Sequence, residues 1–189
     1  DQSADCQIGD IDPVDYWNLD KAVPDNALSL AQGRDEFEWP DMVSSLHVEG
    51  TQVWLYGWPS YNSMKAAGQR LQEFLLSNPD IGNDIVLVGH SMGGLVSAHA
   101  LSDRDGLRDK VSRVITLGSP HNGSGPGTGW GDLGFQFSAH EMENEFYINQ
   151  RRRNLTAEDM AKTRIAGGSV DPTINHDSAY DRDPMFPGI

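Results

Sequence analysis

The stretch that decides the fold is DIVLVGHSMGGLVSAHAL, residues 84–101. Its first part, IVLVG at 85–89, is a short, continuous apolar run of the kind found in strands buried on both faces of a parallel sheet. Its last part is typical of a helix from Met92 to about Leu101. Between the two, Ser91 stands in the glycine-rich string GHSMGG. The stretch therefore predicts a strand, a sharp corner and a helix in immediate succession.

Strands and helices alternate on both sides of this stretch. Upstream, TQVWLYGW at 51–58 is rich in strand formers, and apolar residues at helical spacing predict an amphipathic helix over 63–77, ended by an Asn-Pro breaker. Downstream, RVITLGS at 113–119 and RIAGGS at 164–169 repeat the buried-strand pattern. This alternation predicts a parallel α/β sheet with right-handed crossovers.

The remaining segments are less regular. Residues 1–36 carry many aspartates and little periodicity, so we expect an irregular segment there, whereas FEWPDMVSSLHVEG at 37–50 favours a short helix. Near the end of a long connection over 120–163, Thr156 followed by Asp159 predicts a capped helix start.

The serine corner has a chemical interpretation. A sharp turn needs neighbours without side chains, and Gly89 and Gly93 let the strand and the helix pass close together while Ser91 Oγ stands exposed. The helix that follows directs its free N–H groups and its positive dipole end at the corner. The N–H of Met92 is therefore placed to stabilise an oxyanion that forms there.

Two motifs in this order resemble the α/β-hydrolase lipases and esterases. VLVGHSMGGLVS at 86–97 contains G-x-S-x-G, the nucleophile elbow, and VITLGSPHNGS at 114–124 contains a G-[ST]-P-H-x-G loop. The resemblance, over roughly residues 37–171, implies a three-layer α/β-hydrolase fold with a mainly parallel central sheet. It also implies hydrolysis of a carboxylic ester, with a fatty acyl group, through an acyl-enzyme: Ser91 attacks, a histidine takes its proton, and an acid orients the histidine.

In this family the triad follows the order serine, acid, histidine. Asp171, just after the apolar run at 164–169, is the acid that this order favours. Other nearby aspartates are alternatives: Asp177, Asp181 and Asp183. His176 is the candidate base because no other histidine follows that run, although the family normally inserts a strand between acid and base. A histidine beyond Ile189, in a longer protein, is the alternative.

Other histidines have structural interpretations. His90 precedes the serine at the strand end, where its ring is expected to point away from Ser91 Oγ. The resemblance implies a loop-shaping role for His121, and His99 is expected to be a packed or surface residue of the helix that follows the corner.

We expect both ends of the family's architecture to be missing from this sequence. No His-Gly dipeptide occurs in the chain, whereas in the family an early core strand ends in His-Gly and the loop after it donates the second oxyanion-hole N–H. The chain also stops at DPMFPGI without a closing strand and helix. We therefore expect one domain over 1–189 that is incomplete at both ends, as in a fragment of a longer hydrolase.

The connection over 120–163 is expected to lie over the site, because loops at the carboxyl ends of parallel strands cover it. It opens glycine-rich and carries aromatic residues, among them Trp130, Phe135 and Phe137. These side chains are predicted to form an acyl-binding wall or lid, with ordinary core packing as the alternative.

The charge of the chain narrows the class of partner. Its 28 Asp and Glu residues against 14 Lys and Arg give a net charge of −14, which argues against a nucleic-acid partner. We expect a small-molecule or lipid ester as substrate, with transient contact to a lipid interface. No cofactor is expected, and no metal, because the Asp-rich segments lack the glycine turn and final Glu of a calcium loop. The oligomeric state stays open, and a secreted location is favoured slightly over a cytosolic one.

Two other functions stay open on the same sequence. Acyl transfer or thioester cleavage would use the same acyl-enzyme chemistry on Ser91. A non-catalytic, hydrolase-like binding module would explain the missing His-Gly and the unusual position of His176.

Overall fold

The computed structural model describes residues 15–18 (backbone only), 51–58, 63–102, 106–123, 141 and 155–166. The chain divides into two compact units, one formed by Asp12–Pro59 and the other by Asp1–Ile11 with Ser60–Ile189, and each is described by itself. The expected single domain over 1–189 stays a prediction. None of the helices in the described ranges has the length and apolar character to cross a membrane.

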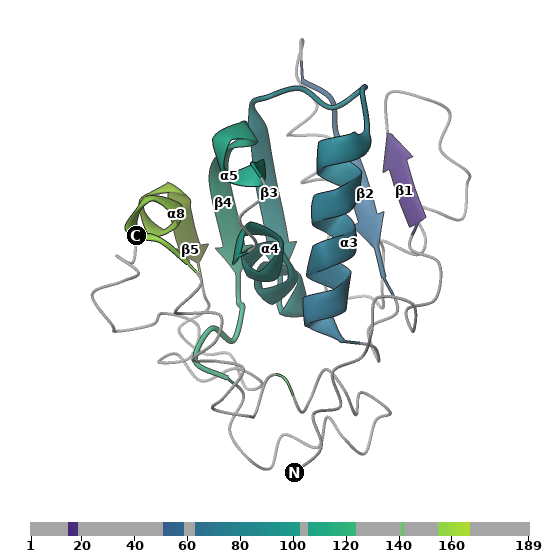
Figure 1. Cartoon of the computed structure of the whole chain (residues 1–189). Helices are drawn as coiled ribbons and strands as arrows, with labels where there is room; N and C mark the ends of the chain where they lie inside the picture. Colours follow the sequence, from purple (N-terminus) through teal and green to yellow (C-terminus); the bar gives the residue numbers. More distant parts are fainter. Residues whose placement is uncertain are drawn as a thin grey trace. The chain divides into compact units, whose positions relative to one another are not determined.

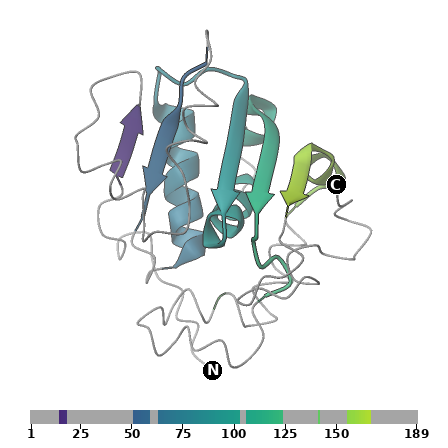
Figure 2. The same ribbon diagram turned by 180° about the vertical axis from the view of Figure 1, so that it is seen from behind.

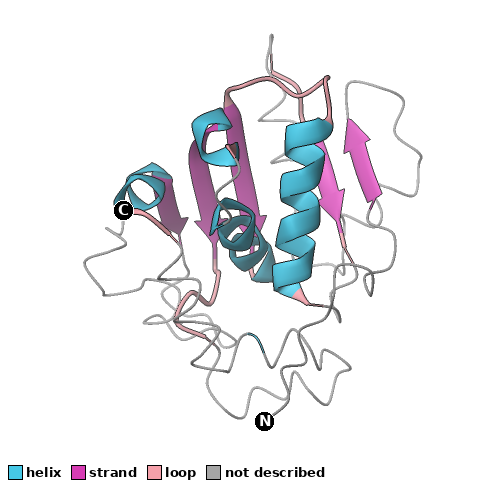
Figure 3. Cartoon of the chain, in the orientation of Figure 1, coloured by secondary structure: helices cyan, strands magenta, loops and turns pink. Residues whose placement is uncertain are grey.

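The smaller unit contains a pair of short antiparallel strands (Figure 3). Strand β1, Asp15–Asn18, pairs with β2, Trp54–Gly57, so that Tyr16 lies opposite Tyr56. Strand β2 confirms the strand predicted over 51–58, whereas β1 lies in the segment that we expected to be irregular. The short helix predicted over 37–50 lies outside the described residues.

The larger unit is built on three parallel strands in the order β3-β4-β5 (Figure 1). Strand β3 is Ile85–His90, β4 is Val111–Leu117 and β5 is Thr163–Ala166. The carboxyl ends of the strands are aligned, because His90 pairs with Leu117, which pairs with Ala166. These strands confirm the apolar runs identified in the sequence and the parallel α/β class.

Helices lie on one face of this sheet. Figure 1 shows α3, Met64–Ser77, and α4, Met92–Ser102, in front of the strands, and Figure 2 shows the strands from the opposite side. Consecutive residues of β3 therefore differ in solvent exposure: Leu87 is 8% exposed, whereas Val86 is 49% exposed. The expectation that this strand is buried on both faces therefore does not hold at Val86, because a continuous apolar run does not reveal whether a second layer covers it.

Most of helix α4 is buried, and the helix packs against α3 and against strands β3 and β4. Every residue from Gly94 to Leu101 is buried, as expected for a helix that is apolar all round. Gly68 of α3 lets the two helices approach closely, since a β-carbon there would lie 2.5 Å from His99 Cβ and 2.9 Å from Val96 O. Of the two positions expected for His99, packed or on the surface, the structure has the packed one, because His99 is buried.

Helix α3 has the predicted bounds. Ser63 caps its start by accepting a hydrogen bond from the N–H of Ala66, and Asn78 ends it. Its buried stripe includes Met64, Leu71 and Leu75, which belong to the apolar residues at helical spacing that predicted the helix. Figure 1 shows α3 running antiparallel to β3, the strand that follows it in the chain.

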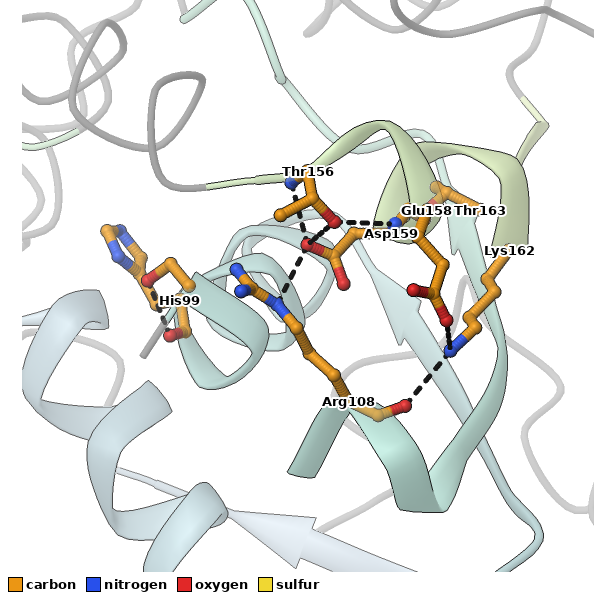
Figure 4. Close-up of polar contacts among 8 residues, drawn as sticks. His99, Arg108, Thr156, Glu158, Asp159, Lys162 and Thr163 are labelled. Carbon is orange, nitrogen blue, oxygen red and sulfur yellow. Dashed lines mark hydrogen bonds and ion pairs between the residues drawn. The ribbon is translucent and has the colours of Figure 1, made fainter. Parts of the chain in front are cut away.

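A polar cluster joins α8, Ala157–Lys162, to α5, Leu107–Lys110 (Figure 4). The predicted cap is present as a capping box: Thr156 Oγ1 accepts from the N–H of Asp159, whose Oδ2 accepts from the N–H of Thr156 at 2.7 Å. The same Oδ2 lies 2.9 Å from Arg108 Nε. Lys162 donates to Arg108 O at 3.0 Å and pairs with Glu158 at 2.8 Å.

Replacing Asp159 with alanine is expected to lower the free energy of unfolding by about 2 kcal/mol, because the capping hydrogen bonds and the buried partner of Arg108 are lost together. Urea denaturation followed by circular dichroism measures the change.

Glu158→Gln is the matched control on the same helix. A hydrogen bond and the charge of Lys162 lower the pKa of the Glu158 carboxyl. Its contribution to stability is therefore present at neutral pH and is lost as the pH falls through that lowered pKa. Glu158 is solvent-exposed, so this contribution is small. An Asp159→Ala urea midpoint as close to that of wild type as the midpoint of Glu158→Gln would show that the contacts of Asp159 do not stabilise the fold.

Candidate active site

Ser91 occupies a strained corner between β3 and α4. Its φ of 51° lies in the left-handed region, and among the described residues it is the one non-glycine residue with a positive φ. Such a conformation costs a side-chain-bearing residue about 1–3 kcal/mol and is found preferentially at functional sites. The corner is held by the N–H of Ser91, which donates to Leu117 O at 2.9 Å, and by Ser91 O, which accepts from the N–H of Gly94 at 3.2 Å.

The backbone of α4 passes directly against β3 at Gly89. A β-carbon at this position would lie 2.5 Å from Gly93 C and 2.5 Å from Gly94 N. Both atoms belong to backbone, which cannot move aside without displacing the helix. The close approach that the sequence predicts for Gly89 and Gly93 is therefore present, and it is what holds Ser91 at the end of the strand.

The loop after β4 packs against the first turn of α4. A β-carbon at Gly94 would lie 2.7 Å from Ser119 Cβ and 3.0 Å from Thr116 Cβ, so this position also requires glycine. Thr116 Oγ1 is 3.0 Å from His121 Nε2, and both side chains are buried. The contact fits the loop-shaping role expected for His121, and the close approach of Gly94 to Ser119 brings the second motif against the helix that follows Ser91.

The arrangement has the elements of an oxyanion site. Met92 is the first residue of α4, and an N–H at the first helical positions has no acceptor within the helix, whereas the N–H of Gly94 already donates to Ser91 O. They lie next to the serine at the positive end of the helix dipole, where negative charge is stabilised. The assignment of Met92 to the oxyanion hole stays a prediction.

Five of the predicted site residues lie outside the described residues: Asp171, His176, Trp130, Phe135 and Phe137. Their roles stay predictions. Among the described histidines, His90 ends β3 one residue after Gly89, which faces α4. Because side chains alternate along a strand, His90 projects from the opposite face of the sheet. Within the described ranges no group of His, Cys, Asp or Glu side chains is arranged to hold a metal ion.

Glu141, which contacts the start of α3, is a buried residue to which no sequence pattern pointed. It is 5% exposed and accepts hydrogen bonds at the start of α3, from the N–H of Met64 at 2.7 Å and the N–H of Lys65 at 3.1 Å. No local spacing could have revealed it, because its partners are more than 70 residues away in the sequence.

Comparison with known families places these features in context. The family model described as "PGAP1-like alpha/beta domain" matches residues 62–183, a range that includes Ser91, Glu141, Asp171 and His176. No solved structure matches the chain significantly.

Curated relatives are similar over about half of the chain. A protein of Eremothecium gossypii named GPI inositol-deacylase is 26% identical over 106 residues, 56% of this chain and 10% of its own length. A protein of Yarrowia lipolytica named putative GPI inositol-deacylase C is 32% identical over 109 residues, 57% of this chain and 12% of its own length. The matched region thus spans about a tenth of the length of these relatives.

Proposed function

This chain belongs to the family of PGAP1-like alpha/beta domains, and we propose on that premise that it is a serine hydrolase that cleaves a carboxylic ester of a lipid. The observation that carries the proposal is the left-handed backbone of Ser91 between a parallel strand and a helix start. A protein has no packing reason to keep a serine in this conformation when glycine adopts it without strain. The strain is accounted for if the hydroxyl has to project from the corner as a nucleophile.

The proposed reaction has two steps on Ser91. In the first, Ser91 Oγ attacks the ester carbonyl while a base takes its proton, and the N–H of Met92 stabilises the oxyanion. Collapse of the tetrahedral intermediate breaks the ester C–O bond, and the protonated base returns the proton to the leaving alcohol. In the second step water attacks the acyl-enzyme in the same way, releasing a carboxylic acid and free Ser91. We assign His176 as the base and Asp171 as the residue that orients it.

The names of the relatives indicate the class of ester. Proteins of Eremothecium gossypii and Kluyveromyces lactis, each 26% identical over their matched residues, are named GPI inositol-deacylase. We propose that the substrate is an acyl group esterified to the inositol of a glycosylphosphatidylinositol. The products are then a free fatty acid and an inositol hydroxyl group.

Incubation of the full protein with an inositol-acylated glycosylphosphatidylinositol tests the substrate. Mass spectrometry should show loss of the acyl mass from the inositol and an equal amount of free fatty acid, while a diacyl phosphatidylcholine in the same micelles is cleaved at least about tenfold more slowly. The preference is expected because a site that hydrogen-bonds inositol hydroxyls leaves its polar groups unpaired with a choline headgroup.

Comparable cleavage of both lipids would contradict the assignment of acylated inositol as the substrate and would indicate a general esterase. Cleavage of neither lipid, nor of a simple p-nitrophenyl ester, by folded full protein would contradict the hydrolase itself.

A further inference from the structure

A buried hydrogen bond joins the end of β4 to the loop that follows the strand. Thr116 Oγ1 lies 3.0 Å from His121 Nε2, and both side chains are buried. In a neutral imidazole this nitrogen either accepts from the hydroxyl or donates to it, and each arrangement gives both buried atoms a partner. The backbone of the loop is closed as well, because the N–H of His121 donates to Ser119 O at 2.9 Å.

Thr116 is linked to the serine corner in two ways. In the chain it precedes Leu117, whose carbonyl oxygen accepts a hydrogen bond from the N–H of Ser91 at 2.9 Å. In space, Thr116 Cβ lies 3.0 Å from the position that a β-carbon on Gly94 would take, so this part of β4 packs directly against the first turn of α4. A displacement of Thr116 would therefore move both the strand end and the helix start that hold Ser91.

The first turn of α4 carries the predicted oxyanion donor. The N–H of Gly94 donates to Ser91 O at 3.2 Å, which couples the positions of these two residues. Met92 lies between them in the chain, and its N–H is the donor predicted to stabilise the oxyanion. Such a donor is effective at about 2.7–3.1 Å from the oxyanion, so a small displacement of the helix start weakens it.

We propose that Thr116 and His121 form a positioning pair of the hydrolase. Their buried hydrogen bond fixes the part of β4 and its loop on which the first turn of α4 packs, and it thereby sets the Met92 N–H relative to Ser91 Oγ. The pair acts on the transition state more than on substrate binding, because the oxyanion exists only in the former. This inference rests on the proposed function and assigns a role in catalysis to a contact that shapes the loop.

Kinetics of Thr116→Val in the full protein test the pair, because valine keeps the branched shape of threonine and lacks the hydroxyl. The value of kcat for p-nitrophenyl butyrate is expected to fall about tenfold, less than the 10²–10³-fold loss typical when an oxyanion donor is removed outright. KM should stay within about twofold of wild type. His121→Ala should show the same division between kcat and KM. The double variant should lose little more than either single variant, because both substitutions remove one shared contact.

Inhibition by a trifluoromethyl ketone gives a second measurement that a purely structural role would not change. Ser91 Oγ forms a bond to the ketone carbon, its proton passes to the base, and the carbonyl oxygen becomes an oxyanion. This adduct resembles the tetrahedral transition state. The inhibition constant of Thr116→Val should therefore rise about tenfold, in parallel with the loss in kcat.

Two control variants separate positioning from stability and from packing. Thr116→Ser keeps the hydroxyl and should keep kcat within about threefold of wild type. Thr163→Val removes another buried threonine hydrogen bond of the same sheet, from Thr163 Oγ1 to Asp159 O at 2.7 Å. Thr163 begins β5 and pairs with Val114, so it lies away from the corner. Its substitution should lower the urea midpoint and leave kcat unchanged.

The outcomes distinguish this inference from the function on which it rests. Folded Thr116→Val with the kcat and inhibition constant of wild type would overturn the positioning pair. An equal loss of kcat in Thr163→Val or in Thr116→Ser would overturn it too, since stability or packing would then explain the loss. Folded wild-type protein that neither cleaves the ester nor reacts with a fluorophosphonate probe would overturn the hydrolase itself. His121→Ala keeps the test available if Thr116→Val fails to fold.

Discussion

Replacing Ser91 with alanine is expected to lower kcat for ester hydrolysis by about 10⁴-fold or more, because the acyl-enzyme cannot form without the nucleophile. The remaining rate would come from substrate binding and from the oxyanion donors at the start of α4. The fold should be retained, since alanine has the same backbone restriction as serine at the φ of 51°. Steady-state kinetics with p-nitrophenyl butyrate measure the loss, and circular dichroism verifies the fold.

Ser91→Gly separates the effect of backbone strain on stability from the effect of the hydroxyl group on catalysis. Glycine adopts a positive φ without steric cost, so this variant should be inactive yet more stable than wild type by about 1 kcal/mol. A folded Ser91→Ala protein with at least a tenth of wild-type activity would contradict the nucleophile assignment. A Ser91→Gly protein that is less stable than wild type would contradict the interpretation that the corner is strained.

Gly89→Ala is expected to lower the free energy of unfolding by about 3 kcal/mol or more, which is the largest effect expected on stability. The added methyl group would lie 2.5 Å from Gly93 C and from Gly94 N, so strand and helix would have to separate. Separation moves Ser91 relative to the first N–H groups of α4, and we therefore expect activity to fall as well. Urea denaturation gives the stability, and fluorophosphonate labelling of the folded fraction gives the reactivity.

Gly82→Ala is the control for the intrinsic effect of the substitution. No heavy atom lies within 4 Å of the position that its β-carbon would take. Its unfolding free energy should change by less than about 1 kcal/mol. Similar urea midpoints for Gly89→Ala and Gly82→Ala would show that β3 and α4 are not in close contact at the corner.

Features set by neighbouring residues could be predicted from the sequence. The strand, corner and helix over 84–101 depend on an apolar run and on glycines close to Ser91, and the structure has all three. The capping box of α8 was also predictable, because Thr156 and Asp159 are three positions apart in the chain. In each case the physical cause and the sequence signal lie in the same short segment.

Features set by distant partners could not be predicted in this way. Strand β1 is only four residues long within an Asp-rich segment, and it pairs with β2, far along the chain. Glu141 is one acidic residue among several in its segment, and only the fold brings it to the start of α3. The exposure of Val86 depends on whether another layer covers the sheet, which the apolar run itself does not encode.

The predicted triad illustrates the same division. Ser91 is identified by its immediate neighbours, and the strained corner expected there is present in the structure. Asp171 and His176 would have to meet Ser91 through tertiary folding, and their assignment rests on order along the chain. The Ser91 experiments should be accompanied by the substitution of His176 with alanine in the full protein. Unchanged ester turnover in that variant would show that His176 is not the base.

Mass spectrometry of the full protein after reaction with a fluorophosphonate probe tests most directly whether Ser91 is a catalytic nucleophile. One covalent adduct is predicted, on the peptide that contains Ser91, and it should be absent from Ser91→Ala. Heat-unfolded protein should not react, because the hydroxyl is activated only by the folded corner and its partners. Folded wild-type protein that stays unmodified, or that carries the adduct on another residue, would contradict the central claim.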